Sequence, residues 1–178
     1  KRQHILEGNK ELIHIEEQDG GLATWAPMRG AWASSTRSEL AGLVVAMGTS
    51  IAIHVGIDNA AVVNKATSLI EKARGYEIQG RTYPKKPLKK PFGLQGDGDL
   101  WVEFWGILEA RGAHSVKVTK VKGHATEWEV QEGIATEEDK EGNDNADAAA
   151  DKGARSLQEG LVVFAKWAKV REQKYTAL

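Results

Sequence analysis

Three carboxylates of this chain lie at positions from which they could act together on a phosphodiester. Glu39 lies in the segment S-S-T-R-S-E-L, Asp58 ends the apolar run I-A-I-H-V-G-I-D, and Asp147 lies in G-N-D-N-A-D-A-A-A. His124, in V-K-G-H-A-T, comes between Asp58 and Asp147. Acids at the ends of separate elements can converge in space, and converging carboxylates hold cations such as Mg²⁺ over a phosphodiester. These residues therefore predict an enzyme that cleaves phosphodiester bonds.

The composition predicts one globular domain, residues 1–178. Of the 178 residues, 41% are hydrophobic and 28% charged, so the chain is long enough to bury a core. The lack of cysteine excludes disulfides and thiolate metal sites. No apolar run reaches membrane-spanning length and no apolar export signal opens the chain, so we expect an intracellular protein, cytoplasmic or nuclear, with no membrane partner. The chain begins without a methionine, and we expect a fragment of a longer protein.

The elements that must position these acids follow from the periodicity of the apolar residues. Residues 12–17 alternate between apolar and polar, and Q-D-G-G then precedes L-A-T-W-A, which predicts an antiparallel hairpin. Apolar residues spaced three and four apart between 40 and 47 predict an amphipathic helix. The following run, 51–57, carries little charge and predicts a central strand covered on both faces.

The second half of the chain reads mainly as helix. We expect a helix from residue 59 to about 74, a loop rich in Gly, Pro and Lys to about 98, and a helix over 99–112. A strand begins near residue 116 and ends near 124. An acidic loop over 126–142, a helix over 143–157 and a last helix over 158–176, as a C-terminal extension, complete the pattern.

This order of elements predicts an α/β fold with a mixed sheet. Helices between the later strands indicate a parallel part, and the hairpin adds an antiparallel edge. Ligands of such sheets collect at the carboxyl ends of the parallel strands, where Asp58 stands.

Each of the four residues also has a structural interpretation. Thr36, followed three residues later by Glu39, matches a capping box at a helix start. Asp58 could be the N-cap of the helix that follows it.

The remaining two have equally simple alternatives. Asp147 is flanked by Asp144 and Asp151 at helical spacing, which is typical of a solvated acidic face. His124, in a loop that contains glycine, could be an ordinary surface residue. The case for function depends on the four occurring together and in this order.

The segment 81–90, R-T-Y-P-K-K-P-L-K-K, holds five basic residues and no acid. A solvated loop is the simplest interpretation of such a run. The net charge of the chain is −1, however, so any binding of nucleic acid must come from a local patch, and this is the one concentration of positive charge.

Taken together, these segments resemble the type 1 ribonuclease H family, in particular the domains carried by retroelements. The resemblance covers about residues 34–155 and rests on S-S-T-R-S-E-L-A-G-L, I-D-N-A-A-V-V, G-D-L-W, V-K-G-H-A and G-N-D-N-A-D-A-A-A. It implies an RNase H-like α/β fold, with a five-stranded mixed sheet flanked by helices. It also implies hydrolysis of the RNA strand of RNA–DNA hybrids with Mg²⁺ or Mn²⁺, within a retroelement polyprotein that carries a reverse transcriptase.

The resemblance also implies roles for individual residues. Glu39, Asp58 and Asp147 match three of the four family carboxylates that bind two metal ions, and His124 matches a histidine that assists proton transfer or product release. The implied substrate contacts are Ser35 and Thr36 near the RNA 2′-hydroxyls, and Lys85, Lys86, Lys89 and Lys90 on the DNA strand. Asn59 is a further expected substrate-binding residue.

The family's first carboxylate has no clear match. It should lie in an opening strand well before Glu39, and residues 1–4 contain no acid. Asp19 is too close to Glu39 and reads as part of a turn, which leaves Glu7 as the nearest candidate. We expect the opening strand to be absent or degenerate, so that three carboxylates stand where the family uses four.

The implied mechanism places two divalent ions about 4 Å apart across the scissile phosphate, with Asp58 bridging them between Glu39 and Asp147. Two alternatives stay open at this point. One is a catalytically weak or inactive RNase H-like module that binds hybrid within a retroelement polyprotein. The other is a transposase or integrase core, against which the pairing of V-K-G-H-A with N-D-N-A-D argues.

Overall fold

The computed structural model describes residues 14–18, 21–25, 34–153 and 155. The chain divides into two compact units, one formed by residues 1–31 with 144–178 and the other by residues 32–143. Glu7, the expected opening strand and the expected helix over 158–176 lie outside the described residues.

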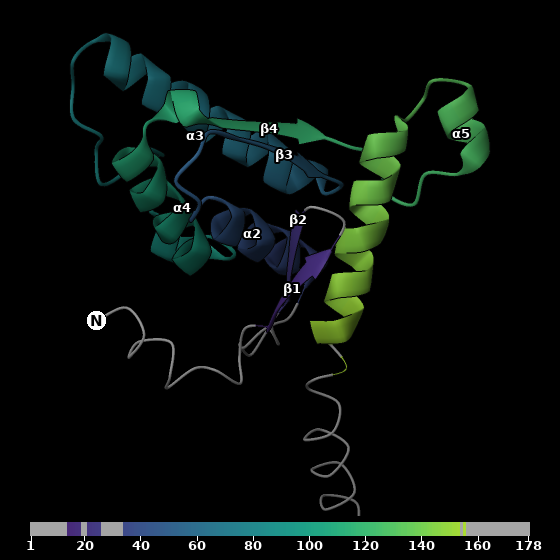
Figure 1. Cartoon of the computed structure of the whole chain (residues 1–178). Helices are drawn as coiled ribbons and strands as arrows, with labels where there is room; N and C mark the ends of the chain where they lie inside the picture. The colour runs from purple at the N-terminus through teal and green to yellow at the C-terminus, as the bar shows by residue number, and fades with distance from the viewer. Residues whose placement is uncertain (1–13, 19–20, 26–33, 154, 156–178) are drawn as a thin grey trace, which may run out of the picture. The chain divides into compact units, whose positions relative to one another are not determined.

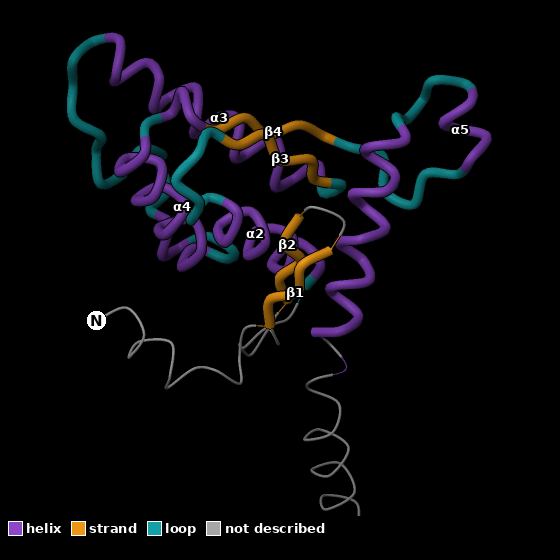
Figure 2. The backbone as a smooth tube through the Cα atoms, in the orientation of Figure 1, coloured by secondary structure: helices purple, strands orange, loops and turns teal. Residues whose placement is uncertain are grey.

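The first unit contains a β-hairpin and a helical segment. Strands β1 (His14–Gln18) and β2 (Gly21–Trp25) lie side by side (Figure 2). They pair antiparallel, with His14 opposite Trp25. This confirms the predicted hairpin. Residues 144–153 are helical, and Lys152 Nζ lies 4.6 Å from the centroid of the Trp25 ring, a cation–π contact between this segment and the hairpin.

The second unit holds a parallel pair of strands and the helices that pack on it (Figure 1). Its helices and strands are α2 (Ser35–Ala46), β3 (Ile53–Ile57), α3 (Ala60–Ile78), η1 (Phe92–Leu94), α4 (Gly98–Arg111), η2 (Ala113–Ser115), β4 (Val116–Lys120) and α5 (Glu127–Gln131). Strands β3 and β4 pair in parallel, with Ile53 opposite Val116 and Ile57 opposite Lys120. The helices expected near 40–47, 59–74 and 99–112 and the strands near 51–57 and 116–124 are therefore confirmed, although α3 continues to Ile78 and β4 ends at Lys120.

The core of the second unit forms where α2, α3 and α4 meet the strands. Leu40, Leu69, Phe104, Leu108 and Val116 are all at most 1% exposed. They come from all three helices and from β4, so one cluster fixes the helices against the strand pair. Complete burial of such side chains stabilises the fold by about 1.5–3 kcal/mol each.

The five-stranded mixed sheet that the sequence suggested is wrong. The described residues form mostly helix, with the β1–β2 hairpin and the β3–β4 pair as two separate two-stranded sheets. The prediction that β3 is covered on both faces is also wrong, since His54 and Gly56 are exposed. The physical reason is the alternation of the strand, whose apolar residues Ile53, Val55 and Ile57 all belong to one face.

The segment 126–142 is not the acidic loop that its charge suggested. It contains α5, and residues 137–142 are helical. The signal that was missed is a capping box: Thr126 accepts a bond from the amide of Glu129, and Glu129 accepts one from the amide of Thr126. Glu129 also pairs with Lys122 at 3.2 Å.

Within the described residues, no helix is both long enough and apolar enough to span a membrane.

Candidate functional site

Asp58 directly follows β3 and is half-buried. It does not cap α3, because Asn59 does: Asn59 Oδ1 accepts hydrogen bonds from the amides of Ala61 at 3.1 Å and Val62 at 3.2 Å. The structural interpretation of Asp58 as a helix N-cap is therefore wrong. Asp58 remains at the carboxyl end of a parallel strand, the position where ligands of parallel sheets collect.

The chain that follows β4 passes directly over Asp58. The Val121 amide donates to the Ile57 carbonyl at 3.1 Å, which extends the β3–β4 pairing by one residue. Two residues later, Gly123 lies so close to Asp58 that a Cβ added to it would be 2.5 Å from Asp58 Oδ2. The V-K-G-H segment and the I-D-N segment, far apart in sequence, therefore meet at the carboxylate of Asp58.

His124 comes next in the chain and has a left-handed backbone, with a φ of 51°. This conformation is uncommon outside glycine, although histidine is among the residues enriched in it. Its side chain is exposed. The turn at Gly123 and His124 thus places an exposed imidazole one residue from the glycine that contacts Asp58.

Glu39 lies beyond the first turn of α2 and is half-buried. The N-cap of α2 is Ser34, whose Oγ accepts a hydrogen bond from the Arg37 amide at 3.1 Å. The predicted capping box of Thr36 and Glu39 is therefore wrong, because the helix begins two residues earlier than that motif requires.

Ser35, Thr36 and Asn59 were expected near the substrate, and the structure brings two of them together. Asn59 Nδ2 donates to Thr36 Oγ1 at 3.1 Å, which joins the start of α2 to the start of α3. Because the Thr36 hydroxyl is the acceptor in this bond, its own proton can still be donated. Ser35, at the start of α2, is exposed.

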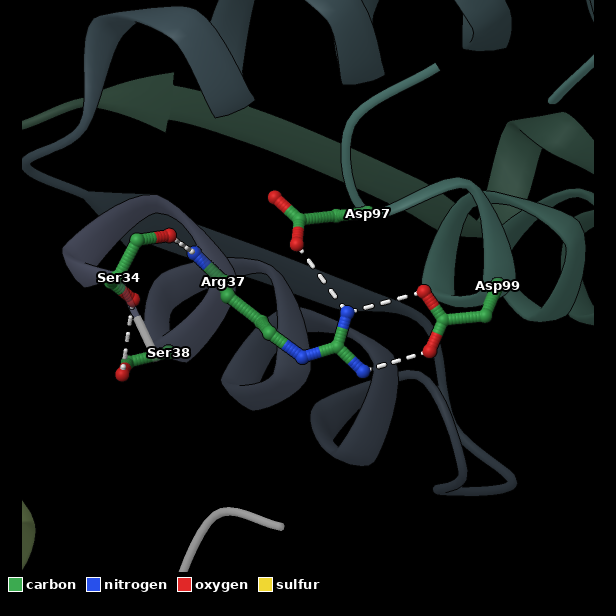
Figure 3. Close-up of polar contacts among 5 residues, drawn as sticks. All are labelled: Ser34, Arg37, Ser38, Asp97 and Asp99. Carbon is green, nitrogen blue, oxygen red and sulfur yellow. Dashed lines mark hydrogen bonds and ion pairs between the residues drawn. The ribbon is translucent and has the colours of Figure 1, made fainter. Parts of the chain in front are cut away.

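Arg37, one residue after Thr36, forms an ion-pair network that the sequence did not predict. Figure 3 shows its guanidinium bridging two acids at the start of α4: Nη1 lies 3.1 Å from Asp97 and 2.9 Å from Asp99, and Nη2 lies 2.5 Å from Asp99. The hydrogen bonds that Arg37 donates to Asp99 lower the pKa of Asp99 to about 2. The side chain of Arg37 is only 17% exposed, so this network fixes α2 against α4 beside Thr36. The alternation of acids in G-D-G-D could have signalled it.

The basic segment 81–90 is anchored at its first residues. The Tyr83 ring lies 4.9 Å from the Trp105 ring, and Trp105 Nε1 donates to the Pro84 carbonyl at 3.0 Å. Tyr83 Oη donates to Glu77 at 2.6 Å, and this bond lowers the pKa of Glu77, whereas burial and the same carboxylate raise the pKa of Tyr83.

The other end of the segment is anchored as well. Gln95 Nε2 donates to the Lys90 carbonyl at 2.5 Å, while Lys65 Nζ donates to Gln95 Oε1 at 2.8 Å and lies 4.3 Å from the centroid of the Trp101 ring. Burial lowers the pKa of Lys65. Lys85, Lys86, Lys89 and Lys90 are exposed between these two anchors. The four charges therefore stand on a fixed segment.

Asp147 belongs to the other unit, where it lies in the helical segment 144–153. It is exposed, as are Asp144 and Asp151, and Asp151 lies 3.8 Å from Arg155. Within the part of the chain that is described, no three His, Cys, Asp or Glu side chains are grouped so that they could hold a metal ion. The assignment of Glu39, Asp58 and Asp147 to a common metal site stays a prediction.

No family model matches the chain, and no curated protein or solved structure does so either.

Proposed function

We propose that this chain hydrolyses the RNA strand of RNA–DNA hybrids with the help of Mg²⁺ or Mn²⁺. The observation that carries the proposal is the place of Asp58. It directly follows a parallel strand, Asn59 and not Asp58 caps α3, and Gly123 lies against its carboxylate. A half-buried acid that the helix start does not need is well suited to bind a cation.

The oxygen ligands of the site suit Mg²⁺ and Mn²⁺, which prefer carboxylates to imidazole or thiolate. Two such ions, when bound, would activate a water for in-line attack and neutralise charge on the phosphate and on the leaving 3′-oxygen. Asp58 and Glu39 would hold them from the second unit. For Asp147, as for the two-ion arrangement, the support is the sequence motif alone.

His124 would act on the proton of the leaving group or on product release. Its support is the turn that follows β4, which keeps the imidazole exposed and next to Gly123.

Recognition of the hybrid would come from two places. The hydroxyls of Ser35 and Thr36 would contact the RNA 2′-hydroxyls, which distinguish RNA from DNA. The four exposed lysines of the anchored segment would contact backbone phosphates, and the anchored backbone of the segment would reduce the entropy lost on binding.

A binding module without catalysis is the second candidate. The anchored lysines favour it, because they would attract a nucleic-acid backbone whether or not a metal ion is bound. In that case the chain would organise hybrid within a larger retroelement polyprotein, in an intracellular compartment.

A cleavage assay separates the two candidates. An RNA–DNA hybrid, the matching DNA duplex and the matching RNA duplex are incubated with the chain in Mg²⁺, in Mn²⁺ and in excess EDTA. We expect cuts in the RNA strand of the hybrid alone, and no cuts in EDTA. Binding of the hybrid without cleavage in either metal would favour the binding module.

A further inference from the structure

Gly123 stands out among the described glycines for what a side chain on it would meet. An added Cβ would lie 2.5 Å from Asp58 Oδ2, 3.2 Å from Asp58 Cβ and 3.3 Å from Asp58 Cγ. All three of its nearest neighbours are therefore side-chain atoms of one residue, and that residue is the acid at the carboxyl end of β3.

Gly56, on β3, offers a comparison on the same strand pair. A Cβ there would lie 2.7 Å from Val121 Cγ1. The clash is similar in size, but the neighbour is an aliphatic side chain that can be shortened without touching Asp58. Comparing substitutions at the two glycines therefore distinguishes the effect of crowding the strand pair from the effect of crowding the Asp58 carboxylate.

We propose that Gly123 is a positioning residue for Asp58: by lacking a side chain, it lets the chain after β4 close over the strand end and fixes where the carboxylate lies. The consequence for catalysis rests on the function proposed above, whereas the steric relationship does not. A methyl group at Gly123 would displace Oδ2 first, and rotation of the carboxylate alone would leave the close contact with Asp58 Cβ.

Such a displacement should alter cation binding more than folding. The atom that must move furthest is the end of a side chain, and the contact with Asp58 Cβ needs a shift of about a few tenths of an ångström, so the fold can absorb the change. A metal ligand, however, must be held within about 0.5 Å of its productive position. Losing the group that holds a ligand in place typically costs about 10–100-fold in metal affinity or activity.

The test compares Gly123→Ala with two control variants of the full chain. Gly106→Ala, in α4, adds a methyl group with no neighbour within 4 Å. Gly56→Ala combined with Val121→Ala adds a methyl group to β3 and shortens the side chain that it would meet. Each protein is measured for thermal unfolding, for the carboxyl ¹³C resonance of Asp58, for Mn²⁺ binding by the metal alone, and for hybrid cleavage in Mg²⁺.

We expect Gly123→Ala to unfold at nearly the wild-type temperature, to move the Asp58 resonance, and to lower Mn²⁺ affinity and kcat by about 10–100-fold with KM unchanged. The controls should keep the wild-type Mn²⁺ affinity and kcat. An unmoved Asp58 resonance with unchanged Mn²⁺ affinity would overturn the proposal, as would equal effects in the Gly56→Ala, Val121→Ala variant. If the wild-type chain cleaves no hybrid but Gly123→Ala still moves the Asp58 resonance, the positioning role stands and the proposed function fails.

Discussion

Asn59 Nδ2 donates a hydrogen bond of 3.1 Å to Thr36 Oγ1, and through it the residue after Asp58 is tied to the first turn of α2. The same Asn59 side chain caps α3 through its oxygen. One amide therefore fixes two helix starts at the carboxyl end of β3, and its two functions can be separated by substitution.

Replacing Asn59 tests this arrangement. Asn59→Ala should lower the free energy of unfolding by about 1–2 kcal/mol, because it removes both the cap and the bond to Thr36. Asn59→Asp should cost less, because a carboxylate still caps α3 and can accept a hydrogen bond from the Thr36 hydroxyl in place of the one that Asn59 donates. Urea denaturation of the two variants and of Thr36→Val measures the difference. Equal losses for Ala and Asp would mean that the cap contributes nothing.

The Arg37 network should appear in the acid stability of the chain. Arg37 depresses the pKa of Asp99 to about 2, so the contribution of this pair is complete above the ordinary pKa of Asp, about 3.9, and is lost as the pH falls towards 2. Arg37→Gln should therefore flatten this part of the dependence of unfolding free energy on pH. Asp99 is 64% exposed, so we expect a contribution below about 1 kcal/mol.

A second acid also contributes to the loss of stability at low pH, and a control variant separates its contribution from that of Asp99. Glu77 also has a lowered pKa, chiefly through the Tyr83 hydroxyl, so its contribution is likewise lost in acid. Tyr83→Phe removes that bond and keeps the ring against Trp105. If Arg37→Gln leaves the pH dependence unchanged while Tyr83→Phe flattens it, the Arg37 network does not stabilise the fold.

These networks show what the sequence could and could not predict. The hairpin, α2, β3 and α4 follow from the period of their apolar residues, which is a local property. The position of the N-cap of α2 does not follow from this period, because S-S-T-R-S-E allows an N-cap at Ser34 or at Thr36. Which residue caps the helix depends on partners far away in the sequence. Asn59 donates a hydrogen bond to the Thr36 hydroxyl, and the Arg37 guanidinium donates one to Asp99.

The same distinction applies to the candidate site. The sequence alone identified Asp58 as a candidate, because the residue follows a run of apolar residues that predicts a parallel strand. The contact with Gly123 could not be predicted, because it depends on the pairing register of β3 with β4. The prediction of a five-stranded sheet was wrong for a related reason. The pattern of apolar residues does not determine which strands pair, and each described strand pairs with only one partner.

The anchored lysines should set the salt dependence of hybrid binding. Replacing Lys85, Lys86, Lys89 and Lys90 by Ala should weaken binding and flatten the log–log salt slope by about 0.9 for each lost phosphate contact. Turnover of bound hybrid should change much less. The control replaces the same four lysines by Arg, which keeps the charge. An Ala variant with the wild-type slope would mean that the segment is only solvated.

The three acids of the helical segment 144–153 test whether the sequence motif identifies one functional carboxylate or whether any acid of the segment would serve. Asp147→Asn should abolish hybrid cleavage, because Asp147 matches the motif, whereas Asp144→Asn and Asp151→Asn should have small effects. Asp151 lies close to Arg155, which gives it a local partner on the exposed surface. Cleavage rates of the three variants, each at equal thermal stability, measure this. If Asp151→Asn is the inactive variant, the assignment is wrong by one helical turn.

The central claim is that Asp58 binds a catalytic cation, and Asp58→Asn tests it most directly. Asn59 caps α3, so this substitution changes the charge of the carboxylate and leaves the helix start intact. We expect the unfolding temperature and the binding of hybrid to be kept, while hybrid cleavage in Mg²⁺ falls by more than about 100-fold, since losing even an outer-shell partner costs 10–100-fold. A folded Asp58→Asn protein that cleaves hybrid at the wild-type rate would contradict the account.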